Sequence, residues 1–343
     1  MILKKLLVPK PFSGGLILSY RCSGECKHCM YFGTPKWENI WISEKDLEII
    51  LEKLSEFIKP SPYGSENVSL NYGLHITGGE PFLNYNILLK SIQLGNELKI
   101  PSLFVETNCY WCKNDEITKE KLNELRRNGL KGILISVNPF ILEHIPFEHT
   151  ERAIKKSKDI FGNNVMIYQK YYYYQFKSLG IKEKFSIEQY LRKVDINDLQ
   201  KKVELFQMGR AAYKLQDFYK KHPSNFFFKE NCQLDLVRNW HNHFDNYRNY
   251  MPGYCGGLSW GNIRNLDSLC NEGINLDDFP VFRCLILGNM KDLYDYSVEN
   301  FDFRENSDGY ISKCHLCTDI RRKIVIETNK IKELKPREFY FHI

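Results

Sequence analysis

The sequence predicts an α/β fold built on a parallel sheet, and three observations carry that prediction. Short apolar runs alternate with segments of helical periodicity over roughly the first half of the chain. Parallel strands need long crossover connections, and helices usually supply them. At 343 residues, with 43% hydrophobic and 26% charged residues, the chain has the composition of a soluble globular protein with a substantial core. The length fits one large domain plus a smaller one.

The expected strands are short apolar runs that end in glycine or in polar residues. Runs of about four to eight residues rich in branched aliphatic side chains are typical of buried strands. We expect strands over residues 15–19, 70–77, 102–107, 132–137, 165–167 and 203–208.

The expected helices lie between these strands and carry recognisable start and stop signals. Ser43 opens a helix that runs to about Ile58 and stops before Pro60. Gly129 and Gly162 follow two other helices, because glycine accepts the left-handed conformation that often ends a helix. The helices are expected over residues 43–58, 85–98, 118–128 and 150–161.

Residues 168–198 interrupt this alternation. They include the consecutive tyrosines 171–174, which could stack on bases but which we interpret as a half-buried strand or lid. A short helix is expected after Ser186, which has a capping-box pattern with Gln189. A boundary near residues 221–225 would divide the chain into domains 1–222 and 223–343.

Eleven cysteines are the unusual feature of the composition. An odd number leaves one thiol outside any complete set of disulfides. The N-terminus has no secretion signal and no apolar run approaches a membrane span, so we expect a cytoplasmic protein with reduced thiols and no membrane partner. The net charge of +6 is mild and does not by itself indicate nucleic acid, so we expect no nucleic-acid partner.

The first cysteines are Cys22, Cys26 and Cys29, with the spacing C-x3-C-x2-C. Three thiolates on one loop can hold three corners of a [4Fe–4S] cluster and leave one iron open. Zinc would need a fourth ligand, for which His28 is a candidate. We favour the cluster and expect His28 to form a wall of the site.

A second motif, Gly78-Gly79-Glu80-Pro81, follows the strand expected over residues 70–77. Together with the cysteine triplet it resembles the radical SAM superfamily, over about residues 14–215. The resemblance implies a partial (βα)6 TIM-type barrel whose cluster binds S-adenosylmethionine through the open iron. It implies that Gly78, Gly79 and Glu80 line the methionine amino group. It also implies that His28 and Tyr31 lie near the adenine.

Other candidates lie where expected strands end, since catalytic groups of such barrels lie at the carboxyl ends of the strands. Glu106-Thr107-Asn108 resembles the Glu-Thr-Asn stretch that relatives place beside the cofactor, and Ser136 matches a position near its ribose or methionine end. Arg210, in a Gly-Arg-Ala turn, would also lie near the cofactor. The same rule points to Asn138 and Gln169.

The C-terminal part resembles the SPASM and twitch extensions of radical SAM enzymes, which bind auxiliary clusters. The resemblance lies in a hairpin expected over residues 243–257, although Arg248-Asn249 replaces the usual turn glycine. It implies a small α+β iron–sulfur domain with one auxiliary [4Fe–4S] cluster. Cys270 is an alternative to Cys232 as one of the four ligands of this cluster. The ligands of this cluster would be Cys232, Cys255, Cys314 and Cys317.

The remaining thiols have alternative interpretations. Cys284 is expected to be a buried apolar thiol. Cys109 and Cys112 are expected to be incidental, although a zinc ribbon formed with Cys314 and Cys317 is the main structural alternative.

The resemblance implies an oxidoreductase or maturase that reductively cleaves S-adenosylmethionine to a 5′-deoxyadenosyl radical and abstracts hydrogen from a substrate carbon. We expect a peptide or protein substrate, and a ferredoxin or flavodoxin as reductant. The alternatives are a radical SAM enzyme acting on a small biosynthetic molecule and a cysteine-rich zinc protein that binds RNA. The sequence identifies no catalytic acid or base.

Overall fold

A seven-stranded sheet forms the centre of the computed structural model, which describes residues 5–195, 197 and 205–343. The strand order is β6-β5-β4-β3-β2-β7-β8. All neighbouring pairs are parallel except β7 and β8, which form an antiparallel hairpin. The strands are β2 (Ser13–Ile17), β3 (Gly73–Thr77), β4 (Phe104–Thr107), β5 (Gly132–Ser136), β6 (Val165–Tyr168), β7 (Asn242–Asp245) and β8 (Tyr250–Met251).

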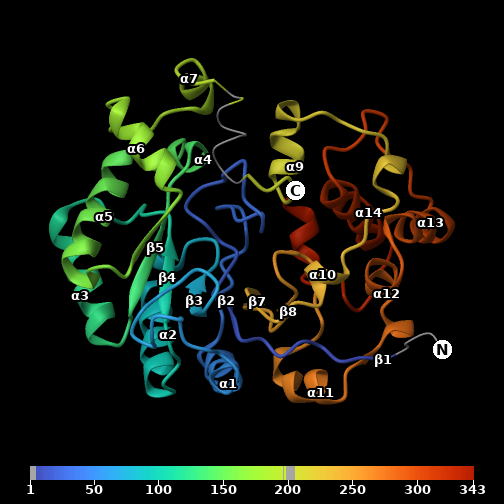
Figure 1. Ribbon diagram of the computed structural model, residues 1–343, viewed down its shortest axis with the longest axis horizontal. Coiled ribbons are helices and arrows are strands. Elements are labelled where there is room, and N and C mark those ends of the chain that lie inside the picture. Colours follow the sequence, from blue (N-terminus) through green and yellow to red (C-terminus); the bar gives the residue numbers. More distant parts are fainter. Residues whose placement is uncertain (1–4, 196, 198–204) are drawn as a thin grey trace.

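Helices α3 and α5 of the first half cover the outer side of this sheet, and α6 and α7 lie beyond the carboxyl ends of its strands (Figure 1). Helix α1 packs on α2, and α3 packs on α5, which also contacts β5 and β6. Ser43 caps α1 by accepting a hydrogen bond from Asp46 N at 3.1 Å, as its sequence predicts. These helices are α1 (Glu44–Ser55), α2 (Tyr85–Glu97), α3 (Asp115–Arg127), α4 (Pro139–Leu142), α5 (Phe147–Phe161), α6 (Lys170–Ser178) and α7 (Ile187–Leu191).

The C-terminal helices form a second group on the far side of β7 and β8 (Figure 1). Helices α12, α13 and α14 pack in succession. A separate two-stranded sheet joins β1 (Lys5–Leu6) to β9 (Ile274–Asn275), so the N-terminal segment crosses to this half. The helices of this half are α9 (Ala211–Lys214), α10 (Gln233–Leu236), α11 (Leu266–Asn271), α12 (Pro280–Leu287), α13 (Met290–Phe301) and α14 (Lys313–Glu327).

The α/β class and the partial barrel of parallel strands are confirmed, but the expected sixth strand is wrong where it can be assessed. Residues 203 and 204 lie outside the described part, and residues 205–208 are not in a strand. There the backbone turns toward the C-terminal helices, and Ser312 Oγ donates a hydrogen bond to Gln207 O at 2.6 Å. The sixth parallel strand is instead β7, which lies toward the opposite edge, between β2 and β8.

The tyrosine run is helical, which corrects the prediction of a strand and leaves that of a lid untested. Tyrosines 171–174 lie in α6, with Tyr172 buried and Tyr174 exposed. Tyr172 and Phe176 are one helical turn apart and both contact Tyr190 of α7. Side chains four residues apart lie on the same face of a helix, so Tyr172 and Phe176 can pack together against α7. This packing outweighs the strand propensity of tyrosine. The helix expected after Ser186 is confirmed as α7, with the capping box in place.

The hairpin expected in the C-terminal part is confirmed as β7–β8. Arg248 in its turn has a φ of 69°, so an arginine takes the left-handed conformation in which glycine is usual. Among the described residues, no helix has both the length and the apolar character needed to cross a membrane.

Candidate active site

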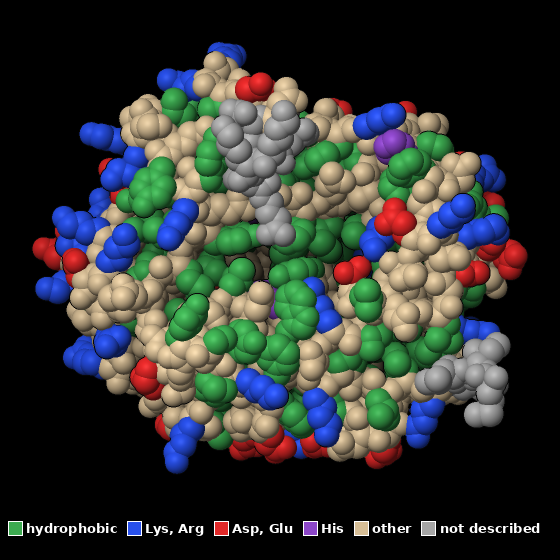
Figure 2. Space-filling model, in the orientation of Figure 1, with side chains coloured by type: hydrophobic (Ala, Val, Ile, Leu, Met, Phe, Trp, Pro, Cys, Tyr) green, Lys and Arg blue, Asp and Glu red, His purple; other side chains and the backbone are tan. Residues whose placement is uncertain are grey.

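A cavity of about 240 Å³ opens at the carboxyl ends of strands β3, β4, β5 and β6. Parallel strands end at the same edge, so polar residues that follow them converge there. Figure 2 shows hydrophobic side chains gathered around a hollow near the middle of one face of the molecule. The cavity lining includes Cys22, Cys26, His28, Cys29, Tyr31, Gly78, Gly79, Glu106, Asn108, Ser136, Asn138 and Gln169.

The three cysteines of the first motif lie on the loop after β2 and all line this cavity. Two of their sulfur atoms accept hydrogen bonds: Cys29 Sγ from Gly33 N at 3.3 Å, and Cys22 Sγ from Asn108 Nδ2 at 3.7 Å. Such bonds stabilise thiolates and are usual around iron–sulfur clusters. Burial raises the pKa of Cys22 to about 12, so a metal would displace protons on binding.

The spacing of the thiols favours a cluster over zinc. Tetrahedral zinc with Zn–S bonds of about 2.3 Å brings its sulfur atoms to about 3.8 Å from one another. Within the described part of the chain, no three cysteines have their sulfur atoms within 4.8 Å of one another. A cubic cluster binds each thiolate through a different iron, so it suits a wider arrangement.

Arg210 lies behind the cysteine loop and does not line the cavity. Its side chain is 2% exposed, and Nη1 donates to Cys26 O and Gly33 O, each at 3.0 Å. Arg210 N donates to Cys29 O at 2.9 Å. The residue therefore holds the backbone of the loop in place, which makes it a positioning residue.

Gly78 and Gly79 bring the backbone after β3 against the start of the cysteine loop. Gly79 N donates to Ser19 O at 2.7 Å. A Cβ atom on Gly79 would lie 2.1 Å from Arg21 O, and one on Gly78 would lie 2.5 Å from Ser19 O. Only glycine allows this approach, which leaves both residues in the cavity wall.

Glu80 is 1% exposed and lies outside the cavity lining. Its carboxylate accepts from Thr107 Oγ1 at 2.9 Å, from Asn108 N at 2.8 Å and from Phe82 N at 3.2 Å. Burial raises the pKa of Glu80 to about 7. The side chain ties the end of β3 to the end of β4, and it orients Asn108 rather than facing the cavity.

Glu106 lies in β4, Asn108 follows this strand and Ser136 ends the adjacent β5, and each of the three lines the cavity. Glu106 Oε2 accepts from Thr77 Oγ1 at 2.8 Å, and burial raises the pKa of Glu106. Besides its bond to the Cys22 sulfur, Asn108 Nδ2 donates to Ser23 Oγ at 3.0 Å. These residues present oxygen and nitrogen atoms to a ligand.

His28 and Tyr31 lie on two sides of the cavity. His28 stacks on Phe140, and its Nε2 is 3.0 Å from Asn138 Nδ2, so this ring nitrogen accepts. Burial lowers the pKa of His28 to about 4, which keeps the ring neutral. Tyr31 Oη lies 3.0 Å from His243 Nδ1 and 3.3 Å from Nε2. An aromatic wall of this kind suits a flat, neutral ring system.

Four C-terminal cysteines form a second group. The pKa of Cys232 is raised mainly by burial and further by the neighbouring Cys317, Cys255 and Cys314. The four thiols therefore lie close enough to interact electrostatically. Cys314 lies in the first turn of α14 and Cys317 at the start of the second, near the helix N-terminus, where the helix dipole favours thiolates. The buried Arg321 lies beside Cys317 and Cys255. Four soft donors and an adjacent cation suit an iron–sulfur cluster.

The other thiols lie elsewhere. Cys270 Sγ is 3.8 Å from Pro9 O, and no other cysteine contributes to its raised pKa. Cys109 lies beside Cys112, and both are fully buried. The structure therefore does not bring together the zinc ribbon considered from the sequence. Cys284 is partly buried and packs against the core.

Three residues of the site have no signal in the sequence reasoning: His75, His241 and His243. His241 and His243 line the cavity, and His75 lies next to them. Burial lowers the pKa of His75 and of His241 to about 3 each, so both rings are neutral at physiological pH. The signal that the sequence reasoning did not use is the pattern His241-Asn242-His243 at the start of β7, because alternate residues of an extended segment share a face.

No protein-family model matches the chain, and no curated protein matches it. Solved structures similar to it include anSMEcpe with bound AdoMet and Cp18Cys peptide, at 14% identity and a TM-score of 0.42, over 92% of this chain and 98% of that one. BtrN in complex with AdoMet and 2-DOIA has 10% identity and a TM-score of 0.38, over 95% and 93%. Streptococcus suis SuiB bound to S-adenosylmethionine has 15% identity and a TM-score of 0.41, over 95% and 74%. These similarities concern the course of the chain alone.

Proposed function

We propose that this protein is a radical SAM enzyme that modifies a peptide or protein. The observation that supports it most is one cavity lined by Cys22, Cys26 and Cys29 together with the Gly78-Gly79 backbone. Residues from the two motifs, about 50 positions apart in the sequence, thus lie around one space at the carboxyl ends of the parallel strands.

The three thiolates would hold a [4Fe–4S] cluster, with one iron left for the amino and carboxylate groups of S-adenosylmethionine. Bound together, the cluster and S-adenosylmethionine would supply a 5′-deoxyadenosyl radical that removes hydrogen from a substrate carbon. Gly78 and Gly79 offer close backbone approach to the methionine end, and His28 and Tyr31 offer aromatic walls for the adenine. Apolar lining residues such as Leu134, Phe140 and Ile141 would limit the contact of water with a reactive species.

The second thiol group would hold one auxiliary [4Fe–4S] cluster. Its proposed ligands are Cys232, Cys255, Cys314 and Cys317, because these four influence one another electrostatically and Cys270 does not join them. A ferredoxin or flavodoxin would supply the electrons.

The decisive test is product release by anaerobically reconstituted protein. With S-adenosylmethionine and dithionite we expect 5′-deoxyadenosine, and we expect none from Cys26→Ala. Cys284→Ala is a matched control because this thiol lies outside both groups, and it should behave as wild type. Absence of 5′-deoxyadenosine from wild-type protein with full iron content would refute the proposal. Zinc in place of iron would refute it as well.

The substrate class needs a separate measurement. Incubation with peptides or proteins produced with this chain, followed by mass spectrometry, should show a mass change that depends on S-adenosylmethionine. Modification of a small metabolite alone, with every peptide unchanged, would support the small-molecule alternative.

A further inference from the structure

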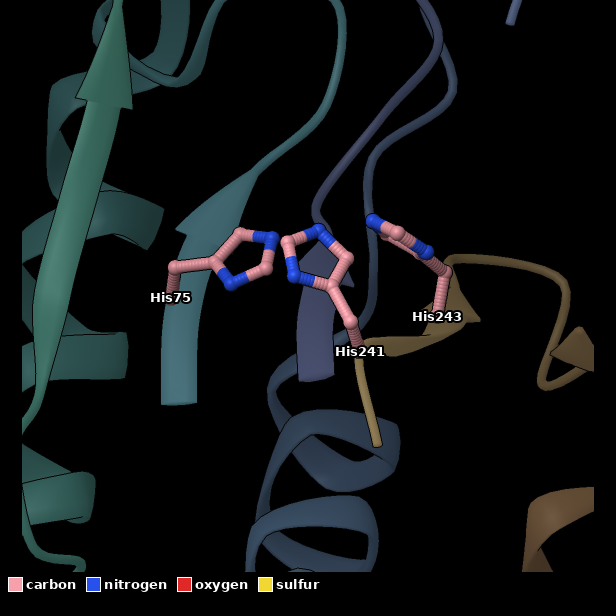
Figure 3. Close-up of side chains that lie close together, drawn as sticks. All are labelled: His75, His241 and His243. Atoms are coloured by element: carbon pink, nitrogen blue, oxygen red, sulfur yellow. The ribbon is translucent and has the colours of Figure 1, made fainter. Parts of the chain in front are cut away.

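Three histidines from two strands meet inside the barrel, beside the cavity. Within the described part of the chain, His75, His241 and His243 are the one group of potential metal ligands whose donor atoms all lie within 4.8 Å of one another. All three are buried. Figure 3 shows the rings converging, His75 from β3 and the other two from β7 and the residue before it.

The strand register brings them together. Gly15 of β2 pairs with His75 on one side and with His243 on the other, so the three residues form one row across the sheet. A Cβ atom on Gly15 would lie 2.3 Å from His75 Nε2 and 2.8 Å from His243 Cδ2. The glycine therefore leaves a space between two strands that the imidazoles occupy, and any larger residue would close it.

Hydrogen bonds orient two of the rings for metal binding. His241 Nδ1 lies 3.1 Å from Leu70 O, and His243 Nδ1 lies 2.9 Å from Gly253 O. A carbonyl oxygen only accepts, so each Nδ1 carries the proton and each Nε2 keeps its lone pair. Metal-binding histidines show this arrangement, in which the distal nitrogen donates to a backbone carbonyl.

The third ring, that of His75, has a nitrogen atom that is free to bind a metal. His75 Nε2 is buried and has no hydrogen-bond partner among the described residues. The nearby acid is Glu106, whose Oε1 lies 3.7 Å away, beyond hydrogen-bonding distance. A buried polar atom without a partner costs about 1–3 kcal/mol, which a bound metal would remove.

We propose that His75, His241 and His243 bind one divalent transition-metal ion, such as zinc or ferrous iron. Imidazole nitrogens are suited to both ions. His241 and His243 line the cavity, so the remaining coordination position faces it, as in metal sites that act on a substrate. The class of ligand for that position is an oxygen or nitrogen donor of the substrate. The proposal does not depend on the cluster at Cys22, Cys26 and Cys29.

Charge and geometry both permit the ion. Arg238 stacks its guanidinium on Tyr254 and reaches His241 O at 3.3 Å, so one positive charge is near, and the Glu106 carboxylate offsets it. Tetrahedral zinc with Zn–N bonds of about 2.0 Å needs nitrogens about 3.3 Å apart. The rings would therefore move inward by small side-chain rotations, and Tyr31 would give up its contact with His243.

The test is zinc binding by the cluster-loaded, full-length protein after treatment with EDTA. We expect about one zinc per chain, counted by mass spectrometry after gel filtration. X-ray absorption at the zinc edge should show imidazole nitrogens at about 2.0–2.1 Å and no sulfur at about 2.3 Å. His75→Gln and His243→Gln should weaken zinc binding at least tenfold while iron per chain stays constant. His222→Gln, which alters a histidine stacked on Phe226, should bind zinc as wild type does.

Three results would overturn the proposal: no stoichiometric zinc, a sulfur shell around the zinc, or unchanged zinc binding in both histidine variants. The wild-type absorption spectrum decides the question even if a variant fails to fold. The outcome is separate from that of the proposed function. Nitrogen-bound zinc in a protein that releases no 5′-deoxyadenosine would support this site and refute the radical chemistry. Release of 5′-deoxyadenosine by a protein that binds no zinc through nitrogen would refute this site and support the radical chemistry.

Discussion

Replacement of Arg210 tests whether the cysteine loop is held from behind. Arg210→Met removes two hydrogen bonds of 3.0 Å, to Cys26 O and Gly33 O, and keeps the aliphatic packing. Hydrogen bonds from a charged donor contribute about 1.5–3 kcal/mol each, so their sum is about 3–6 kcal/mol. Removing the buried charge also removes its desolvation cost, so we expect a loss nearer to 3 kcal/mol.

The assay is anaerobic urea unfolding of the reduced, cluster-free protein, with iron per chain after reconstitution as a second measurement. Arg210→Met should lower the unfolding free energy by about 3 kcal/mol and reduce iron retention under a chelator. The unfolding free energy of Arg210→Lys should lie between those of wild type and Arg210→Met, because one ammonium group does not reproduce the planar fork of the guanidinium. Arg304→Met is the control, since that side chain is 85% exposed. A difference below about 0.5 kcal/mol between the two methionine variants would refute the reasoning.

Three further predictions concern other parts of the molecule. Gly79→Ala should destabilise the protein by about 2 kcal/mol or more in urea unfolding, because its Cβ would lie 2.1 Å from Arg21 O, and equal stability would contradict the contact. Burial raises the pKa of Glu333 from 4.5 to about 7, so the folded state binds its proton more tightly and this stabilisation is lost as pH rises through 7. Glu333→Gln does not titrate, so from pH 5 to pH 8 its stability relative to wild type should rise by about 2.5 kcal/mol, whereas parallel pH profiles would contradict this. Cys232→Ala should lose about four irons per chain and Cys270→Ala none. The opposite result would make Cys270, and not Cys232, a ligand of the auxiliary cluster.

Features set by neighbours in the sequence were predicted best. The capped helix after Ser43 and the hairpin of residues 243–257 depend on local signals, and both are present. The spacing of Cys22, Cys26 and Cys29 also predicts thiols on one loop, since few residues separate them. Local patterns of this kind need no knowledge of the rest of the chain.

Features set by distant contacts were missed or wrong. The row of Gly15, His75 and His243 depends on the pairing of β7 with β2, which are more than 200 residues apart. No local sequence pattern near either strand predicts this pairing. For the same reason the sixth strand was expected after residue 200 instead of at 242–245. The backbone contacts of Glu80 with Asn108 N and of Arg210 with Cys26 O join segments that are far apart in the sequence, so no local pattern predicts them, and the placement of both residues near a cofactor stays a prediction.

The position of β7 has a consequence for how the chain is made. β2 spans residues 13–17, and its neighbour β7 is not synthesised until residue 245. During synthesis β2 therefore keeps one edge without its parallel neighbour while most of the barrel has already left the ribosome. An unpaired strand edge invites pairing with other chains. A fragment that ends near residue 222 would retain that exposed edge permanently, so we expect it to aggregate where the full-length protein does not.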